Sequence, residues 1–259
     1  MNEGSVPNQV EESTHQPLAG KAALVTGAGR GIGRAIALAY AQAGAAVVCA
    51  ARTTAEITAT ANQIVASGGR AFAITADVAH QPAVEQLFGQ AVDQFGGIDI
   101  VVINAGVSRD RRTVEESVVE EWRATVEVNL FGAYYCAKAA LPHLRARGGG
   151  KIIMIGSGMG HRSGAGSSAY ACSKAGLWML TRVLAQEVWQ DNISVNELIP
   201  GPVDTAMTTD VAARRGPAFG TDSEWIKGPE DVVPLALFLA TQPLVGPTAQ
   251  SYSLMRRDM

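Results

Sequence analysis

The stretch "AALVTGAGRGIGRAIALAYAQAG", residues 22–44, decides the fold. Its first six residues form a short apolar run closed by glycine, which is typical of a buried strand. From Gly31 onward the apolar spacing is helical and ends at Gly44. The glycines at 27, 31 and 33 leave room where the backbone turns sharply and approaches a ligand. A glycine-rich turn between a strand and a helix predicts a pyrophosphate site at the helix N-terminus.

Apolar strands alternate with helices through the rest of the chain. Further strands are expected at residues 45–51, 70–77, 98–106, 151–157, 193–201 and 249–255. Helices are expected at residues 53–69, 81–97, 117–147, 168–189 and 229–242. Such alternation predicts an α/β protein whose seven-stranded parallel sheet is covered by helices on both faces, a doubly wound Rossmann fold.

The composition is that of a globular protein built as one domain. The chain has 259 residues, of which 47% are hydrophobic and 17% charged. Residues 1–18 are polar and are predicted to be a flexible N-terminal extension, so the domain is expected to span 19–259. The stretch of about 203–227 is punctuated by Pro and Gly and is interpreted as a loop over the substrate.

Charge and cysteine usage argue against several classes of partner. A net charge of −3 gives no basis for binding nucleic acid or an anionic membrane surface. No apolar run reaches the ~18 residues of a membrane span, and the N-terminus lacks the pattern of a secretory signal. Cys49, Cys136 and Cys172 are widely separated without metal spacing. They are interpreted as small buried thiols of a cytoplasmic protein, and no metal site is expected.

The segment "SAYACSKAG", residues 168–176, places Tyr170 and Lys174 four positions apart. Residues at that spacing share one helix face, and such pairs also occur on ordinary solvated helices. A free tyrosine has a pKa of about 10, so it is a poor acid or base at neutral pH unless a neighbouring charge changes that value. The pair is therefore a catalytic candidate that needs support from the rest of the chain.

The sequence resembles the short-chain dehydrogenase/reductase family. "TGAGRGIG" has the family's TGxxxGxG spacing and "YACSK" its YxxSK pattern. Other family segments follow in order: "ADV" at 76–78, "NAG" at 104–106, "VNL" at 128–130, "IGS" at 155–157, "PG" at 200–201 and "GPEDV" at 228–232. The resemblance extends from about Leu18 to Leu254. It implies hydride transfer between a nicotinamide cofactor and a carbonyl or alcohol carbon.

The resemblance also implies a catalytic role for four residues. Tyr170 is the expected acid/base, and Lys174 is expected to lower the pKa of the Tyr170 phenol and to bond the cofactor's ribose. Ser157 matches the serine that bonds the substrate oxygen. Asn129 matches the asparagine that holds a water in the proton relay. In isolation these two residues would be read as a strand-end serine and a helix-kink asparagine.

Cofactor choice is predicted from charge. Where NAD-preferring relatives have an acidic residue at the end of the second strand, this chain has Ala51 followed by Arg52, and the glycine turn adds Arg30. Arginine grips phosphate well, so NADP(H) is predicted over NAD(H). The predicted cofactor-binding residues are Gly27, Arg30, Gly31, Ile32, Gly33, Arg52, Asp77, Val78, Asn104, Ala105, Gly106, Tyr170, Lys174, Pro200, Gly201, Val203 and Thr205.

The substrate is less well defined by the sequence. Met159, Met207 and Phe219 favour a moderately hydrophobic small-molecule carbonyl compound. A 3-oxoacyl-[acyl-carrier-protein] or acyl-CoA reductase is an alternative, and "NAGVSRD" at 104–110 is similar to that group of the family. A non-catalytic NADP(H)-binding protein is a second alternative. Gly156 and the C-terminal tail depart from the family pattern.

A homotetramer is the expected assembly. The resemblance implies that subunits pair through the helices at residues 127–147 and 168–189. Alanines in these helices would allow close packing between subunits, although they would equally suit packing on the sheet. They are Ala133, Ala137, Ala171 and Ala175.

Overall fold

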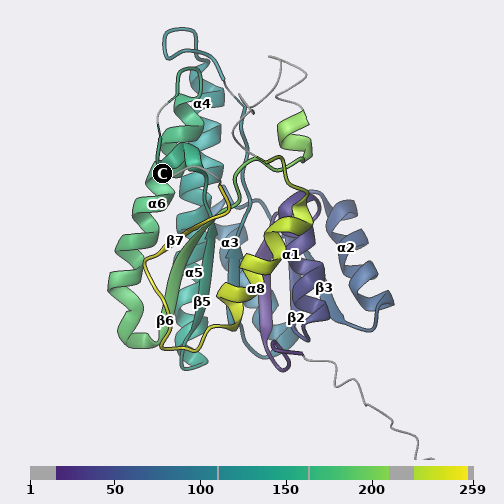
Figure 1. The fold of residues 1–259 in the computed structure, drawn as a ribbon. Coiled ribbons are helices and arrows are strands. Elements are labelled where there is room, and N and C mark those ends of the chain that lie inside the picture. Colours follow the sequence, from purple (N-terminus) through teal and green to yellow (C-terminus); the bar gives the residue numbers. More distant parts are fainter. Residues whose placement is uncertain (1–15, 110, 163, 210–224, 256–259) are drawn as a thin grey trace, which may run out of the picture.

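The computed structural model describes residues 16–109, 111–162, 164–209 and 225–255. Seven parallel strands form one sheet in the order β3-β2-β1-β4-β5-β6-β7 (Figure 1). The strands are β1 (Ala22–Thr26), β2 (Ala46–Ala51), β3 (Arg70–Thr75), β4 (Ile100–Ile103), β5 (Gly150–Ile155), β6 (Ile193–Ile199) and β7 (Ser251–Ser253). This confirms the predicted doubly wound parallel sheet.

Helices cover both faces of the sheet, and each face has its own apolar core. The helices are α1 (Gly31–Gln42), α2 (Thr54–Ala66), α3 (Gln81–Phe95), α4 (Val119–Val126), α5 (Gly132–Ala146), α6 (Ser168–Val188) and α8 (Val233–Thr241). On one face α1, α2 and α8 pack together, and the Tyr40 hydroxyl of α1 donates to the Ala236 carbonyl of α8 at 2.8 Å. On the other face α3, α5 and α6 contribute to a second core, in which Phe88 of α3 is fully buried.

The expected helical region 117–147 contains an irregularity. Between α4 and α5 the chain forms a π-helical turn, η1 (Glu127–Phe131), which carries Asn129. The alanines expected to pack between subunits differ in how deeply they are buried. Ala133 and Ala137 are buried in the core against the sheet, whereas Ala171 and Ala175 on α6 are half-buried.

The strand order places a ligand crevice above the centre of the sheet. The chain runs from β1 outward to β3 and then returns to β4 on the other side of β1. At such a reversal the loops after the two central strands diverge, and a crevice opens at their carboxyl ends. Ser157, after β5, is at this edge.

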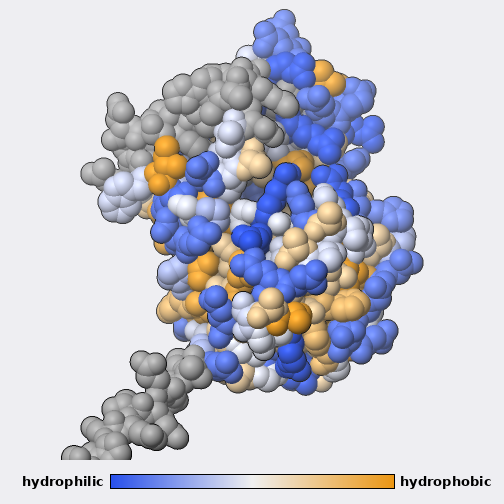
Figure 2. All heavy atoms as spheres, turned by 90° about the vertical axis from the view of Figure 1, so that its right-hand side faces the viewer, coloured by the Kyte–Doolittle hydropathy of each residue, from blue (hydrophilic) through white to orange (hydrophobic). Residues whose placement is uncertain are grey.

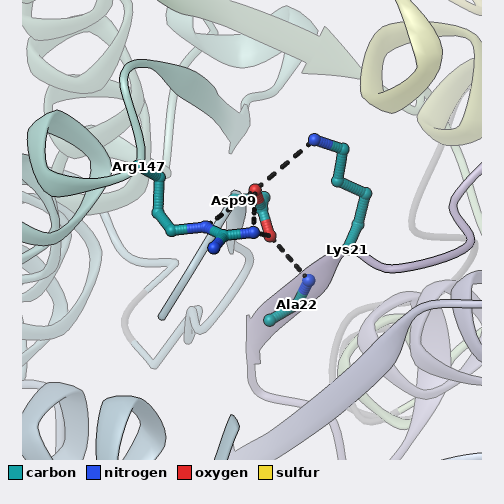
Figure 3. Close-up of polar contacts among 4 residues, drawn as sticks. All are labelled: Lys21, Ala22, Asp99 and Arg147. Atoms are coloured by element: carbon teal, nitrogen blue, oxygen red, sulfur yellow. Dashed lines mark hydrogen bonds and ion pairs between the residues drawn. The ribbon is translucent and has the colours of Figure 1, made fainter. Parts of the chain in front are cut away.

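A buried carboxylate ties the opposite, amino edge of the sheet together (Figure 3). Asp99, just before β4, accepts from the Ala22 backbone N–H at 2.9 Å and from the Arg147 Nε at 3.2 Å. Lys21 Nζ lies 3.5 Å from the same carboxylate. The group joins β1, β4 and the end of α5 on the side of the sheet away from the crevice.

The structure bears on the predictions made for the N-terminal extension and the cysteines, whereas much of the predicted substrate loop lies outside the described residues. Leu18, placed in the extension, is 1% exposed and packs in the core, while residues 1–15 and 210–224 lie outside the described residues. Burial raises the pKa of Cys49 and of Cys136 to about 12. Cys172, however, is exposed, so the prediction of buried thiols was wrong there.

The molecular surface is mixed in polarity. On the side shown in Figure 2, hydrophilic residues dominate the upper right, and apolar residues lie between hydrophilic ones lower down. In the described part of the chain, no helix combines the length and hydropathy needed to cross a membrane.

Candidate active site

A cavity of about 910 Å³ opens at the carboxyl edge of the sheet. It brings together nearly all the predicted site residues, although they come from six different strand ends and the start of α6. Met159 and Met207 also line it, and Phe219 lies outside the described residues. Gly33 and Asn129 lie behind the lining residues and support them.

The glycine turn forms the floor of one end of the cavity. Gly27 and Gly31 have φ angles of +67° and +55°, in the left-handed region that favours glycine. A Cβ at Gly33 would overlap the Gly27 carbonyl oxygen, so α1 approaches the turn too closely for any side chain. The first turn of α1 reads Gly-Ile-Gly-Arg, and its unpaired N–H groups suit an anion. These features fit the pyrophosphate of a dinucleotide.

Asn104 fixes the loop after β4 to the end of β1. Its side-chain amide donates to the Thr26 carbonyl at 2.8 Å, and its backbone N–H donates to the Thr26 hydroxyl at 2.9 Å. The Ala105 N–H donates to the same hydroxyl at 3.0 Å. The two central strands therefore diverge at a fixed separation beside the predicted ribose site.

The predicted catalytic residues converge at the other end of the cavity. The Ser157 side chain hydrogen-bonds the Tyr170 phenol. Lys174 Nζ lies 5.9 Å from the centre of the Tyr170 ring and donates to the Ile155 carbonyl at 2.7 Å. Lys174 is only 5% exposed, so its ammonium group is largely removed from water.

The pKa directions differ in part from the sequence expectation. Burial raises the pKa of Tyr170, while the Ser157 hydrogen bond and the Arg111 charge lower it. Burial lowers the pKa of Lys174 to about 8, and the negative charge of Glu197 acts against that shift. Desolvation outweighs the contributions of Ser157 and Arg111 and favours the neutral phenol, so the pKa of Tyr170 is raised rather than lowered as expected.

Asn129 is held by its own hydrogen bonds between the loop after β4 and α6. Its Oδ1 accepts from the Val107 N–H at 2.8 Å, and its Nδ2 donates to the Val107 carbonyl at 2.9 Å and the Ser173 hydroxyl at 3.0 Å. The π-helical turn carries this side chain into contact with the loop after β4 and with α6. Asn129 thus joins the two walls of the site.

Arg52 follows β2 and Arg30 lies in the glycine turn just before α1, and each has an acidic neighbour. Arg30 lies 3.8 Å from Glu56, and Arg52 lies 4.0 Å from Asp77. Glu56 and Thr53 line the cavity and were missed by the sequence analysis. They lie at the start of α2, where a glutamate is an ordinary helix-start residue, so the sequence carried no signal for them.

Two further neighbours of the catalytic residues were also missed. Met255, beyond β7, fills the space beside Gly158. Glu197 lies in the middle of β6 and is 0% exposed. A carboxylate in the middle of the predicted buried strand "ISVNELI" was a usable signal, because charged residues are almost never fully buried without a specific partner.

The comparisons with known proteins agree with this geometry. Residues 21–216 match the family described as short chain dehydrogenase. A 3-oxoacyl-[acyl-carrier-protein] reductase of Synechocystis is 37% identical over 227 residues, covering 87% of this chain and 91% of the relative. A short-chain type dehydrogenase/reductase of Picea abies is 40% identical over 86% of this chain and 87% of its own length.

Solved structures give the same result. A short-chain type dehydrogenase/reductase from Mycobacterium marinum has a TM-score of 0.86 at 33% identity, over 91% of this chain and 94% of that one. A protein from Beutenbergia cavernae, proposed to be an NAD(P)-dependent gluconate 5-dehydrogenase and solved with NADP at low occupancy, has a TM-score of 0.84 at 35% identity. It covers 91% of this chain and 95% of its own.

The fold and the cavity define a nucleotide-binding oxidoreductase of the doubly wound class. Within that class, the chain belongs to the short-chain dehydrogenase family, whose members act on CH–OH groups with a nicotinamide cofactor.

Proposed function

We propose that the protein is an NADP(H)-dependent carbonyl reductase that also works as an alcohol dehydrogenase. The observation that carries this proposal is the meeting of Tyr170, Lys174 and Ser157 in the cavity that holds the glycine turn. The acid/base, its charged neighbour and a substrate-bonding hydroxyl are thus all beside a dinucleotide cradle. We propose that the catalytic and cofactor-binding residues predicted from the sequence have the roles given for them there.

Each catalytic residue has a defined task in the reduction. Bound NADPH supplies the hydride that reduces the carbonyl carbon. Ser157 holds the carbonyl oxygen by a hydrogen bond, and Tyr170 gives its phenolic proton to that oxygen. Lys174 stabilises the resulting tyrosinate by its positive charge. In the alcohol direction Tyr170 accepts the proton, so this direction requires the deprotonated phenol.

NADP(H) is proposed over NAD(H) because of the charges near the end of β2. Ala51 provides no carboxylate to bond the ribose hydroxyls, and Arg30 and Arg52 lie beside the cavity. Both of their ion pairs, at 3.8 and 4.0 Å, are longer than a good charged hydrogen bond. A ribose 2′-phosphate would offer these guanidinium groups a stronger partner.

A 3-oxoacyl-thioester reductase is the second candidate function. The Synechocystis relative supports it, and so does the arginine-rich loop after β4. Arg109 is exposed in that loop and Arg111 lines the cavity. A basic mouth of this kind suits an acidic carrier protein.

A homotetramer in the cytoplasm is proposed as the working form. Large apolar side chains are exposed along the two helical regions expected to pair, which supports the assembly. They are Phe131, Tyr134, Met179 and Val183. The three unpaired thiols support the location, because reducing compartments keep cysteines in that form.

The test is oxidation of NADPH and NADH by wild type and Tyr170→Phe, with cyclic ketones, aromatic ketones and a β-ketoacyl thioester. Wild type is expected to use NADPH faster. Tyr170→Phe is expected to lose about 10²- to 10⁴-fold in turnover while still binding NADPH, because only the proton transfer is removed. Tyr134→Phe, at an exposed tyrosine of α5, is the matched control.

Two results would contradict the proposal. Turnover by Tyr170→Phe within a few-fold of wild type would remove Tyr170 as the acid/base. Tight NADPH binding by wild type with no turnover of any ketone or thioester would favour a non-catalytic NADP(H)-binding protein. A tenfold or greater preference for the carrier thioester over simple ketones would select the second candidate function.

A further inference from the structure

Glu197 is a buried carboxylate directly behind the catalytic residues. Its Oε2 accepts from the Ser251 hydroxyl at 2.6 Å and lies 2.9 Å from His161 Nε2. Its Oε1 is buried and has no hydrogen-bond partner in the described part of the chain. Burying a carboxylate is costly unless partners compensate, so its position in the middle of a fully buried strand calls for a role.

The location of Glu197 accounts for an unusual residue of the active-site strand. A Cβ at Gly156 would overlap Glu197 Oε1, so only glycine leaves room for this carboxylate. The two neighbours of Gly156 both serve the site. Ile155 accepts the Lys174 ammonium through its carbonyl, and Ser157 bonds the Tyr170 phenol. Glu197 therefore lies under the backbone segment that carries both catalytic contacts.

We propose that Glu197 is a positioning residue for the reaction: its carboxylate, held by His161 and Ser251 beneath Gly156, is the buried counter-charge of the Lys174 ammonium group. The proposal rests on the proposed function, in which Lys174 must be charged to stabilise the tyrosinate. Glu197 acts through Lys174 and does not touch the reacting atoms.

The electrostatic balance around Lys174 supports this role. Burial lowers the pKa of Lys174 to about 8, and the charge of Glu197 holds that pKa up. Without the carboxylate, the pKa of Lys174 is expected to fall further, so that less of the amine is protonated at working pH. Loss of that positive charge is then expected to raise the pKa of Tyr170, because tyrosinate loses a cation that lies 5.9 Å from the centre of its ring.

Other titratable and charged groups lie around Lys174 and Glu197. Tyr170 is the titrating neighbour on α6, and His161 faces Glu197 from the loop after β5. Arg111 acts on Tyr170 from the loop after β4. The contacts from the π-helical turn are neutral, since Asn129 bonds Ser173 there.

The experiment compares wild type with Glu197→Gln, which keeps the shape and removes the charge. The pKa of Lys174 is measured directly by NMR of ¹³Cε-labelled lysine, which is practical because the chain has only five lysines. Lys174→Arg assigns the signal. The pKa of Lys174 is expected to fall by about one unit or more in Glu197→Gln. This readout needs no turnover, so it stands even if the proposed function fails.

Activity gives the second readout. In alcohol oxidation with NADP⁺, the acid limb of the kcat/KM profile is expected to move about one unit to higher pH in Glu197→Gln, which corresponds to about tenfold lower activity on that limb. Glu197→Asp keeps the charge and is expected to keep the profile near that of wild type. Asp99→Asn removes a buried carboxylate at the other edge of the sheet and is expected to lower stability without moving the profile.

A merely structural Glu197 would give a different pattern. Glu197→Gln would then lose activity by the same factor at every pH, with an unshifted Lys174 pKa, and that result would overturn the proposal. If Glu197→Gln does not fold, the double variant Gly156→Ser/Glu197→Ala refills the vacated space and also lacks the carboxylate. It is expected to show the same fall in the pKa of Lys174, and an unchanged pKa there would equally overturn the proposal.

Discussion

Arg52 is the residue through which we propose that the protein prefers NADP(H). Its side chain is 51% exposed and lies 4.0 Å from Asp77, a geometry in which an ion pair contributes little to stability. The guanidinium group is therefore free to turn toward a ribose phosphate at small energetic cost. Because NADH has no 2′-phosphate, the contribution of Arg52 should be specific to NADPH.

Arg52→Ala is expected to raise the KM for NADPH about tenfold or more, while the KM for NADH changes by less than about twofold. Steady-state kinetics with both cofactors measure this. Arg34→Ala is the control, since Arg34 Nη2 donates to Gln63 at 2.6 Å and does not line the cavity. Equal rises in KM for the two cofactors would argue against a 2′-phosphate contact.

The sequence predicted the catalytic residues better than it predicted the side chains that contact them. Tyr170, Lys174 and Ser157 stood in recognisable motifs, and the fold brings them together. The partners of Glu197 were not predictable, because His161 and Ser251 come from segments far apart in the chain. Local patterns identify residue types, whereas such contacts depend on how separate loops meet in space.

Among the elements, the turn from β1 into α1 is the most constrained. Added atoms at Gly33 would meet the Gly27 carbonyl and the Asn104 amide at once. Neither neighbour can withdraw easily, because the first is backbone and the second is bonded to the Thr26 carbonyl. The N-terminus of α1 is thereby held close to the predicted pyrophosphate site.

Gly33→Ala is expected to lower the free energy of unfolding by about 1–3 kcal/mol and to weaken NADPH binding tenfold or more. Gly89→Ala is the matched control in α3, where an added Cβ meets open space. That variant should gain about 0.5–1 kcal/mol, because alanine favours a helix over glycine. Denaturant unfolding and NADPH fluorescence report the two effects, and unaltered binding by Gly33→Ala would contradict this account of the turn.

Secondary structure was largely readable from the sequence, with instructive exceptions. Continuous apolar runs marked the buried strands because both faces of the sheet are covered. The π-helical turn Glu127–Phe131 was not readable, since one widened turn leaves the apolar spacing of the flanking helices nearly unchanged. The predicted strand 98–106 was too long, as β4 ends at Ile103 where the chain turns into the site.

For the whole molecule, the buried titratable groups determine how stability depends on pH. Lys151 is 4% exposed, and its Nζ donates to the Pro243 carbonyl at 2.6 Å. Burial, together with repulsion from Lys21, lowers the pKa of Lys151 to about 8. Lys174 has a similarly lowered pKa. The two buried thiols shift in the opposite direction, to pKa values of about 12.

Whether stability rises or falls with pH depends on which state, folded or unfolded, binds more protons. Between about pH 8 and 10.5 the unfolded chain keeps protons on Lys151 and Lys174 that the folded protein has lost, so stability rises with pH. Above about pH 9 the folded protein keeps the protons of Cys49 and Cys136 that the unfolded chain loses, so these groups reduce stability. The two effects place the maximum of stability near pH 9.

The free energy of unfolding is therefore expected to rise by about 1–2 kcal/mol from pH 7.5 to 9, measured by denaturant titration at one protein concentration. Lys151→Met should be more stable than wild type at pH 7 and should lose roughly half of the lysine contribution to this rise, because one of the two lysines is gone. Lys138→Met, at an exposed position on α5, should keep the wild-type dependence. A flat profile in wild type, or an equal rise in Lys151→Met, would mean that Lys151 keeps its proton in the fold.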